Sequence, residues 1–384
     1  MAKHKHIFEQ ISSDENILLA YKNARKNKRY RKEVLQFTNR LEENLLKIKK
    51  DMLSHNFNTS RFREFYIHEP KCRLIMAQPF ESVVKQWAFY QVINPLFVKG
   101  YISDSYACIP GRGQAAAVKR LQYWLRLVNK DAYRAKKQGQ SPKDIDCWYY
   151  LKIDFSKYFY RVDHEIMLKR FDKKIQDPIV RKWIRATLDN PSMSFGLPPG
   201  KKPEEVPRNE RIQGKGMPVG SLISQMLANL YTDPLDQYCK RDLQIRYYIR
   251  YMDDIIILSN SKSKLHIWKK QIEKFADEEM KMVLNEKTCI RPISTGIDFC
   301  GYRIWPTHIK LRKSTSKRMK RRLKLVMKQY ADGKIDFEKA NQVVASYMGI
   351  MSHCNSNNLR ETIFGNMEKG IEGWFYLQKK NEEE

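Results

Sequence analysis

Apolar residues along the chain recur with the spacing of strands and helices, and the clearest strand lies near the middle of the 384 residues. Trp148-Tyr-Tyr-Leu-Lys-Ile-Asp-Phe155 alternates in the manner of a buried strand. Two further strands are expected at 245–251 and 255–259, joined by Met252-Asp-Asp254, and short strands follow around 282–304. The centre of the chain is therefore expected to form a sheet.

Helical spacing fills the stretches between these strands. Helices are expected at 221–238 and 263–280, and Asp163 is placed to cap a third helix. A small antiparallel sheet backed by helices on one face, in the split βαβ style, satisfies this order, so the expected fold class is α+β. The apolar residues expected on the inner faces are Ile166 and Phe171 in the capped helix, and Leu265, Trp268, Ile272 and Phe275 in helix 263–280.

The N-terminal part of the chain is helical and basic. Residues 22–50 carry eleven Lys or Arg and three Glu, and a helix is expected from Glu33. The charges fit either a solvated amphipathic face or a helix that contacts phosphates, with Arg25, Lys26 and Arg29 as candidate contacts. The apolar residues at helical spacing are Val34, Phe37, Leu41, Leu45 and Ile48.

The remaining segments are a turn, a helix, two loops and a second basic helix. Pro110-Gly-Arg-Gly113 predicts a turn, and a helix is expected from Gln114 to Val128. Loops are expected at 130–146 and 190–216. Residues 310–328 hold ten Lys or Arg and no acid. Met319, Leu323, Val326 and Tyr330 nevertheless keep a helical stripe there, and Ser314, Thr315 and Ser316 are the cap candidates.

The charge balance narrows the class of partner. Seventy-two Lys and Arg against 43 Asp and Glu leave a net charge of +29, which a polyanion such as nucleic acid would neutralise. No apolar run reaches the roughly 20 residues that span a bilayer, so no membrane association is expected. The seven scattered cysteines form no Cys-x-x-Cys pair, which favours reduced thiols in a cytoplasmic protein.

Three acids stand at the ends of the central strands. Asp154 ends the strand at 148–155, and Asp253 and Asp254 lie in the connection of an apolar hairpin. If these strands are neighbours, the carboxylates converge and repel one another unless divalent cations neutralise them. Two cations held in this way can activate a 3′-hydroxyl and stabilise a pyrophosphate leaving group. The alternative is a solvated Asp-Asp turn with no chemistry.

Several motifs around these acids resemble reverse transcriptases. Tyr251-Met-Asp-Asp254 resembles the catalytic hairpin of that family, and Leu151-Lys-Ile-Asp-Phe-Ser-Lys-Tyr-Phe159 its first catalytic strand. Glu69-Pro-Lys-Cys-Arg-Leu-Ile75 looks like the fingers motif, and Ser105-Tyr-Ala-Cys-Ile-Pro-Gly-Arg-Gly113 like the motif that follows. Phe299-Cys-Gly-Tyr302 resembles the primer grip. The resemblance implies a right-hand polymerase with fingers, a split-βαβ palm and a helical basic thumb.

The resemblance also implies a role for individual residues. Asp154, Asp253 and Asp254 would be catalytic and, with Phe155, would bind two Mg²⁺ ions, with Mn²⁺ as a possible substitute. Phe159 would exclude the ribose 2′-hydroxyl, although plain core packing is the alternative for this ring. The implied nucleotide contacts are Lys71, Arg73, Phe159, Val219, Gly220, Gln225 and Lys287, and the implied nucleic-acid contacts are Phe299, Gly301, Lys317, Arg318, Arg321 and Arg322, beside Arg25, Lys26 and Arg29.

The implied domains are a basic helical N-terminal extension at 1–60, fingers at 61–148, a palm at 149–308 and a thumb at 309–384.

Val219-Gly-Ser-Leu-Ile-Ser-Gln225 departs from the Gln-Gly-x-x-x-Ser-Pro of most bacterial and intron-type reverse transcriptases. An aliphatic residue in place of Gln, and Gln in place of Pro, is the pattern of reverse transcriptases from diversity-generating retroelements. Those enzymes make cDNA from a template RNA, with errors at template adenines that diversify a target gene. The resemblance implies template RNA, an RNA/DNA hybrid, dNTPs and a small basic accessory protein as partners.

Other functions stay open at this point. An antiviral defence reverse transcriptase shares the palm and makes repetitive or untemplated DNA. An RNA-binding scaffold with an inactive palm belongs to a different class, and the presence of all three aspartates argues against it. A group II intron maturase would carry the usual Gln-Gly sequence, which this chain lacks.

Overall fold

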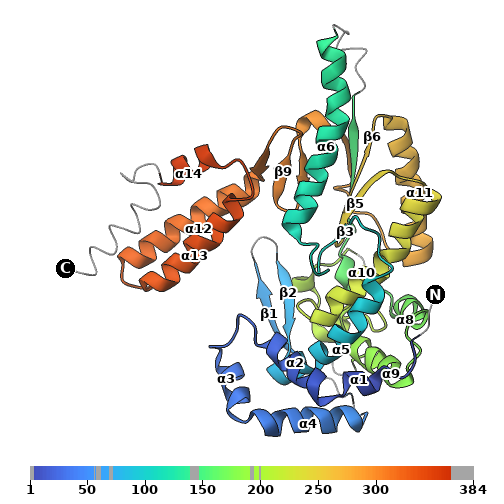
Figure 1. Cartoon of the computed structure of the whole chain (residues 1–384), viewed down its shortest axis with the longest axis vertical. Coiled ribbons are helices and arrows are strands. Elements are labelled where there is room, and N and C mark those ends of the chain that lie inside the picture. The colour runs from blue at the N-terminus through green and yellow to red at the C-terminus, as the bar shows by residue number, and fades with distance from the viewer. Residues whose placement is uncertain are drawn as a thin grey trace. The chain divides into compact units, whose positions relative to one another are not determined.

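The structure, a computed structural model, describes residues 4–55, 57, 62–68, 72–138, 147–190, 194–198 and 200–364 (Figure 1). The chain divides into two compact units. The first comprises residues 1–110, 151–257 and 263–289, and the second comprises residues 111–150, 258–262 and 290–384. These units do not test the division into extension, fingers, palm and thumb, which stays a prediction.

Four helices open the first unit, and the helix expected from Glu33 through Ile48 is in fact two helices. The break lies at Arg40, where φ is −125° and ψ is 50°. The side-chain amide of Asn44 donates to the carbonyl of Phe37 (2.9 Å), so a side chain replaces a backbone donor at the end of the first helix. The elements up to the central sheet are α1 (Phe8–Ile11), α2 (Asp14–Ala24), α3 (Lys32–Asn39), α4 (Leu41–Leu53), β1 (Arg63–Ile67), β2 (Arg73–Ala77) and α5 (Phe80–Val98).

A five-stranded sheet contains the strands expected at 148–155, 245–251 and 255–259, whereas most of the short strands expected around 282–304 lie in a separate sheet. The order of the five-stranded sheet is β3-β5-β6-β4-β7. The short strand β3 pairs in parallel with β5, with Ser105 opposite Arg250. The sheet is therefore mixed, and the prediction of a purely antiparallel sheet is wrong. The predicted hairpin is confirmed, with Asp254 as the first residue of β6 rather than part of the turn. The strands are β3 (Ser105–Tyr106), β4 (Tyr149–Ile153), β5 (Tyr247–Tyr251), β6 (Asp254–Ser259) and β7 (Cys289–Pro292).

The helices predicted around this sheet are confirmed. Asp163 caps α8, since its carboxylate accepts from the amide of Ile166 at 3.1 Å. Helix α10 buries eleven side chains, and it packs against α5 and α8. In α11 the predicted Leu265 and Ile272 are buried, and Phe275 stacks on Tyr238 with ring centroids 4.6 Å apart. The predicted helices are α8 (His164–Asp172), α10 (Leu222–Gln237) and α11 (Lys262–Met280), and the structure adds α7 (Tyr158–Arg161) and α9 (Pro178–Leu188), which were not predicted.

The described part of segment 190–216 is a loop, as predicted, with two short 3-10 turns. Glu64 of β1 holds this loop, because the Glu64 carboxylate accepts hydrogen bonds from Arg211 (2.5 Å) and from Arg208 (2.8 Å). Burial alone would raise the pKa of Glu64, but the hydrogen bonds and charges of the two arginines outweigh it and hold this pKa below its usual value. The loop is therefore tied to the sheet β1-β2.

In the second unit, α6 (Gln114–Lys137) is longer than predicted. The helix was expected to end at Val128, but residues 130–137 continue it because they contain alanine and long polar side chains and neither Gly nor Pro. The rest of the predicted loop, residues 139–146, lies outside the described residues.

A three-stranded antiparallel sheet and a helical pair complete the second unit. The predicted apolar stripe of α12 is confirmed: Met319, Leu323 and Val326 are buried against α13. The predicted serine and threonine caps are wrong, because α12 begins at Lys313. The amide of Arg312 donates to the Gly301 carbonyl (3.0 Å), which keeps the chain extended up to that residue. The elements are β8 (Ile297–Phe299), β9 (Tyr302–Ile304), β10 (Ile309–Leu311), α12 (Lys313–Ala331), α13 (Phe337–Met351) and α14 (Asn357–Phe364).

Candidate active site

The three aspartates lie on neighbouring strands. Asp154 directly follows β4, Asp253 occupies the turn between β5 and β6, and Asp254 opens β6, which lies beside β4 in the sheet. The chain after Asp154 is held in place, because its carbonyl accepts from the amide of Asn285 at 2.7 Å. The sequence predicted that the carboxylates converge if these strands are neighbours, and the strands are neighbours in the sheet.

The carboxylates influence one another electrostatically. Burial raises the pKa of Asp254 to about 6; Lys152 opposes this shift, and the charges of Asp253 and Asp154 add to it. The ammonium of Lys152 lies 3.0 Å from Asp254 Oδ2. Lys152 was not predicted as a site residue, although its position two residues before Asp154 places both on one face of β4.

The donor chemistry suits a divalent cation, although the arrangement of a complete metal site is not present. Oδ1 of Asp254 is buried and has no hydrogen-bond partner among the described residues, and hard carboxylate oxygens are the ligands that Mg²⁺ prefers. The side chain of Phe155, 2% exposed, has no ligand atom, so this residue could offer only its backbone carbonyl. Within the described residues, no group of three or more His, Cys, Asp or Glu side chains is arranged to hold a metal ion. The metal role of these residues stays a prediction.

A buried arginine, which sequence reasoning missed, holds the turn between β5 and β6. Arg250 of β5 and Asp236 of α10 are both 0% exposed, and Nη2 of the arginine lies 2.7 Å from Oδ2 of the aspartate. The same guanidinium donates to Ser105 Oγ (2.8 Å), to Asn229 Oδ1 (3.1 Å) and to the carbonyl of Met252 (2.9 Å). One side chain therefore connects β3, α10 and the turn before the two catalytic candidates.

The turn needs this support because Met252 has a φ of 57°. That left-handed conformation costs a residue with a Cβ roughly 1–2 kcal/mol. The hydrogen bond from Arg250 to the Met252 carbonyl holds it. Burial would lower the pKa of Arg250, but the charge of Asp236 outweighs burial and raises it, so the guanidinium stays charged. An Arg within an apolar strand and an Asp within an apolar helix were the available sequence signals.

Two separate segments predicted to contact the nucleotide lie beside each other. The carbonyl of Val219 accepts from the amide of Met76 in β2 (2.9 Å), the strand that Arg73 begins. Gly220 has a φ of 107°, and a Cβ there would lie 3.2 Å from Ile75 Cγ2. Glycine therefore suits this close approach to β2.

The other predicted nucleotide contacts differ in exposure, and the carbonyl of Phe159 accepts from the amide of Met217 (2.7 Å), two residues before Val219. Arg73 and Lys287 are exposed. Phe159 in α7 is half-buried, with its ring edge-on to Tyr158 at 5.5 Å. Gln225 Oε1 accepts from the thiol of Cys108 (3.3 Å), which links it to the segment after β3. Lys71 lies outside the described residues.

Comparison with known proteins decides the family. Residues 105–304, more than half of the chain, match the family described as reverse transcriptase (RNA-dependent DNA polymerase). The match contains all three aspartates. The chain belongs to the reverse transcriptase family.

Individual relatives are distant. Protein YkfC of Escherichia coli (strain K12) is 21% identical over 300 residues, which cover 69% of this chain and 72% of YkfC. Apo telomerase from Candida tropicalis is 13% identical with a TM-score of 0.45, over 68% of this chain and 50% of that one. Telomerase from Candida albicans in complex with a TWJ fragment of telomeric RNA is 12% identical with a TM-score of 0.41, over 74% and 52%. The chain spans about half the length of these telomerase chains.

The predicted nucleic-acid contacts of the reverse transcriptase differ in their surroundings. Lys26 and Arg29 are exposed, whereas Arg25 lies over the ring of Tyr21 (5.0 Å) and donates to its hydroxyl (2.9 Å). Phe299 is 1% exposed, so only its backbone could meet nucleic acid. Gly301 has a φ of 81°, in the left-handed region. In α12 the exposed candidates are Lys317, Arg321 and Arg322, with Arg318 half-buried.

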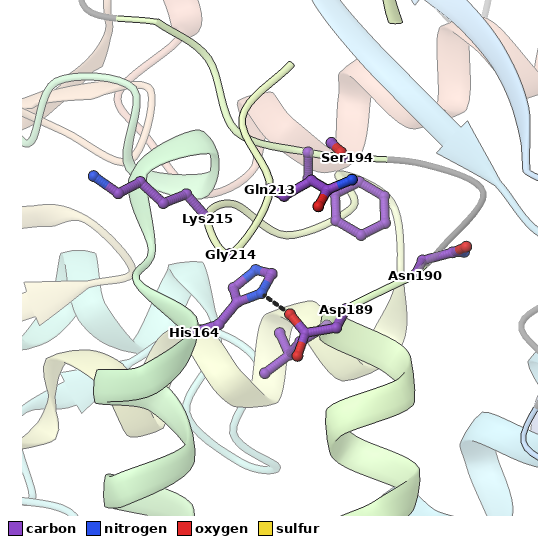
Figure 2. A pocket seen from close by; sticks show the side chains of 9 residues that line it. His164, Asp189, Asn190, Ser194, Gln213, Gly214 and Lys215 are labelled. Atoms are coloured by element: carbon purple, nitrogen blue, oxygen red, sulfur yellow. Dashed lines mark hydrogen bonds and ion pairs between the residues drawn. The ribbon is translucent and has the colours of Figure 1, made fainter. Parts of the chain in front are cut away.

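A cavity of about 300 Å³ lies between α8, α9 and the loop that leads to Val219 (Figure 2). The buried ring of His164 carries Nδ1 2.6 Å from Asp189 Oδ1 and Nε2 2.7 Å from the carbonyl of Gly216. One ring contacts both the end of α9 and the segment at Gly216. The ring therefore fixes Gly216, three residues before Val219, against α8 and α9. The other lining residues are Leu188, Asn190, Ser194, Phe195, Gln213, Gly214 and Lys215.

Among the described residues, no helix combines the length and the apolar character that a membrane crossing requires.

Proposed function

We propose that this reverse transcriptase copies a template RNA into cDNA by two-metal nucleotidyl transfer, and that it is of the error-prone, diversity-generating type. The observation that supports the chemistry is the position of Asp154, Asp253 and Asp254 on neighbouring strands within the family match. Burial raises the pKa of Asp254, and the charges of Asp253 and Asp154 add to the rise; a pair of cations would relieve both effects. The proposed substrates are dNTPs and an RNA/DNA hybrid.

Each residue has a defined task in this proposal. Asp154, Asp253 and Asp254, with the carbonyl of Phe155, would hold the ions. When bound, two Mg²⁺ or Mn²⁺ ions activate the primer 3′-hydroxyl and stabilise the leaving pyrophosphate. Lys152 orients Asp254 through the 3.0 Å contact, and the ring of Phe159 excludes a 2′-hydroxyl.

The error-prone assignment depends on Val219. An aliphatic side chain cannot donate or accept a hydrogen bond, so it cannot restrain the nascent base pair as a glutamine can. Val219 is half-buried, and its carbonyl is bonded to β2, which also carries the proposed triphosphate contact Arg73. This placement beside β2 supports a role for Val219 near the incoming nucleotide. The same assignment proposes a small basic accessory protein as a partner.

Primer extension on an RNA template tests the polymerase. The wild type should make DNA, and Asp253→Ala should make essentially none, whereas Asp242→Ala, which removes an exposed acid, should match the wild type. Full-length DNA from Asp253→Ala would contradict the catalytic assignment. Product that forms without any RNA template would favour the defence-type alternative.

Sequencing the products tests the second part of the proposal. The wild type should misincorporate mainly opposite template adenine, and Val219→Gln should lower that error frequency because a polar restraint is restored. Val219→Ile keeps an aliphatic side chain and should keep the error spectrum. An unchanged spectrum in Val219→Gln would refute the proposed role of Val219.

A further inference from the structure

Helix α6 has one exposed face to which the proposed chemistry assigns no task. Its opposite face is buried in the second unit through Leu121, Trp124, Leu125 and Val128. The exposed residues recur at alternating intervals of four and three residues. At about 100° of rotation per residue, they therefore lie within roughly 80° of one another around the helix axis. This α6 stripe consists of Lys119, Tyr123, Arg126, Lys130, Tyr133 and Lys137.

The composition of the α6 stripe is unusual for a solvated helix face. It combines four cations with two large aromatic rings and contains no acid. The tyrosines are 52% and 63% exposed, and the guanidinium of Arg120 lies over the Tyr123 ring at 5.9 Å, so each ring still has surface open to solvent. At about 1.5 Å per residue the stripe is roughly 27 Å long, and the two rings are roughly 15 Å apart along the helix axis.

These properties fit a single strand of nucleic acid. Cations neutralise backbone phosphates, and exposed rings stack on unpaired bases, which a duplex does not offer. A length of roughly 27 Å corresponds to about four nucleotides, the lower end of the site sizes of single-strand binders. An acidic protein surface would satisfy the cations but would leave the tyrosines without stacking partners.

We propose that the α6 stripe binds single-stranded RNA, through phosphate contacts to the four cations and base stacking on Tyr123 and Tyr133. The choice of RNA over DNA rests on the proposed function, in which the uncopied strand is RNA. The binding itself requires neither metal nor dNTP, so it can be measured apart from catalysis.

Fluorescence anisotropy with a labelled 20-nucleotide oligo(U) RNA tests the cations. The variant Lys119→Gln/Lys130→Gln/Lys137→Gln should reduce the slope of log affinity against log salt by about 2, since each lost phosphate contact on a single strand contributes about 0.7. The matched control is Lys262→Gln/Lys270→Gln/Lys274→Gln, which removes the same charge from exposed positions of α11. Its slope should change by less than half as much. Equal changes in the two variants would overturn the proposal.

The tyrosines have their own test. Tyr123→Ala/Tyr133→Ala should weaken RNA binding about tenfold per ring, and Tyr123→Phe/Tyr133→Phe, which keeps the stacking surface, should bind like the wild type. With 4-thiouridine RNA, ultraviolet cross-links should map to α6. Unchanged binding in the alanine variant, cross-links only outside α6, or a loss confined to single-stranded DNA would overturn the proposal. None of these outcomes alters the Asp253→Ala result, so the two proposals can fail separately.

Discussion

The buried pair of Arg250 and Asp236 should stabilise the fold and position the hairpin that carries Asp253 and Asp254, and these two effects can be separated. In Arg250→Met the guanidinium is lost while the Asp236 carboxylate stays buried, with the hydroxyl of Tyr248 (2.6 Å) as its remaining donor. Breaking a fully buried ion pair costs about 3–5 kcal/mol. Asn229 and Ser105 also lose a donor. We expect Arg250→Met to lower the free energy of unfolding by about 4 kcal/mol.

The double variant Arg250→Met/Asp236→Leu removes both charges and should be at least as stable as either single variant. Apolar replacement of a buried pair is often nearly neutral, so the double variant should recover most of the roughly 4 kcal/mol that the single variant loses. Activity should behave differently. The carbonyl of Met252 lacks its donor in both Arg250 variants, so primer extension should stay slow in the double variant although its stability recovers.

Urea unfolding and single-turnover primer extension, both at 25 °C, measure the two quantities. The control is Arg246→Met, which removes an exposed arginine four residues earlier and should change stability by less than about 0.5 kcal/mol. A loss below about 1 kcal/mol in Arg250→Met would refute the stabilising role. Recovery of full activity in the double variant would refute the positioning role.

Three further predictions concern Phe159, Glu64 and the carboxylates. Phe159→Ala should raise ribonucleotide incorporation relative to deoxynucleotides by about tenfold or more, measured by single-nucleotide competition, whereas Phe159→Tyr should not. The pKa of Glu64 is held below its usual value, so its ion pairs stabilise the protein above about pH 4.5 and this contribution is lost as the pH falls. Glu64→Gln should therefore lower the free energy of unfolding at pH 7 by about 2 kcal/mol and flatten its acid dependence. Mg²⁺ at ten times its Kd should stabilise the wild type by about 1.4 kcal/mol in thermal unfolding, and Asp254→Asn clearly less.

Local sequence patterns correctly predicted those elements that depend on residues close to one another along the chain. The cap of α8 at Asp163, the apolar hairpin and the inner face of α12 are set by neighbours along the chain, and the structure confirms them. The errors arise where a hydrogen bond to a residue farther away along the chain sets the end of an element. The bond from Asn44 to Phe37 divides a helix, and the bond from Arg312 to Gly301 sets where another begins. Neither can be read from apolar periodicity.

The same limit explains what was missed at the candidate site. Asp154, Asp253 and Asp254 were found because they interrupt apolar strands at their ends, where a carboxylate is unexpected. Arg250 also interrupts an apolar strand, but its partner Asp236 is fourteen residues away on a helix, so the sequence did not reveal that one neutralises the other.

The position of β5 explains why the arginine needs such a partner. This strand lies between β3 and β6 in the sheet, and Tyr248, Ile249 and Arg250 are all buried, so the strand has no solvated face at this point. A charge in such a strand must be neutralised within the protein. Asp236 does this and leaves one guanidinium nitrogen to hold the turn at Met252. The turn at Met252 is thus anchored by a residue other than the three carboxylates of the candidate site.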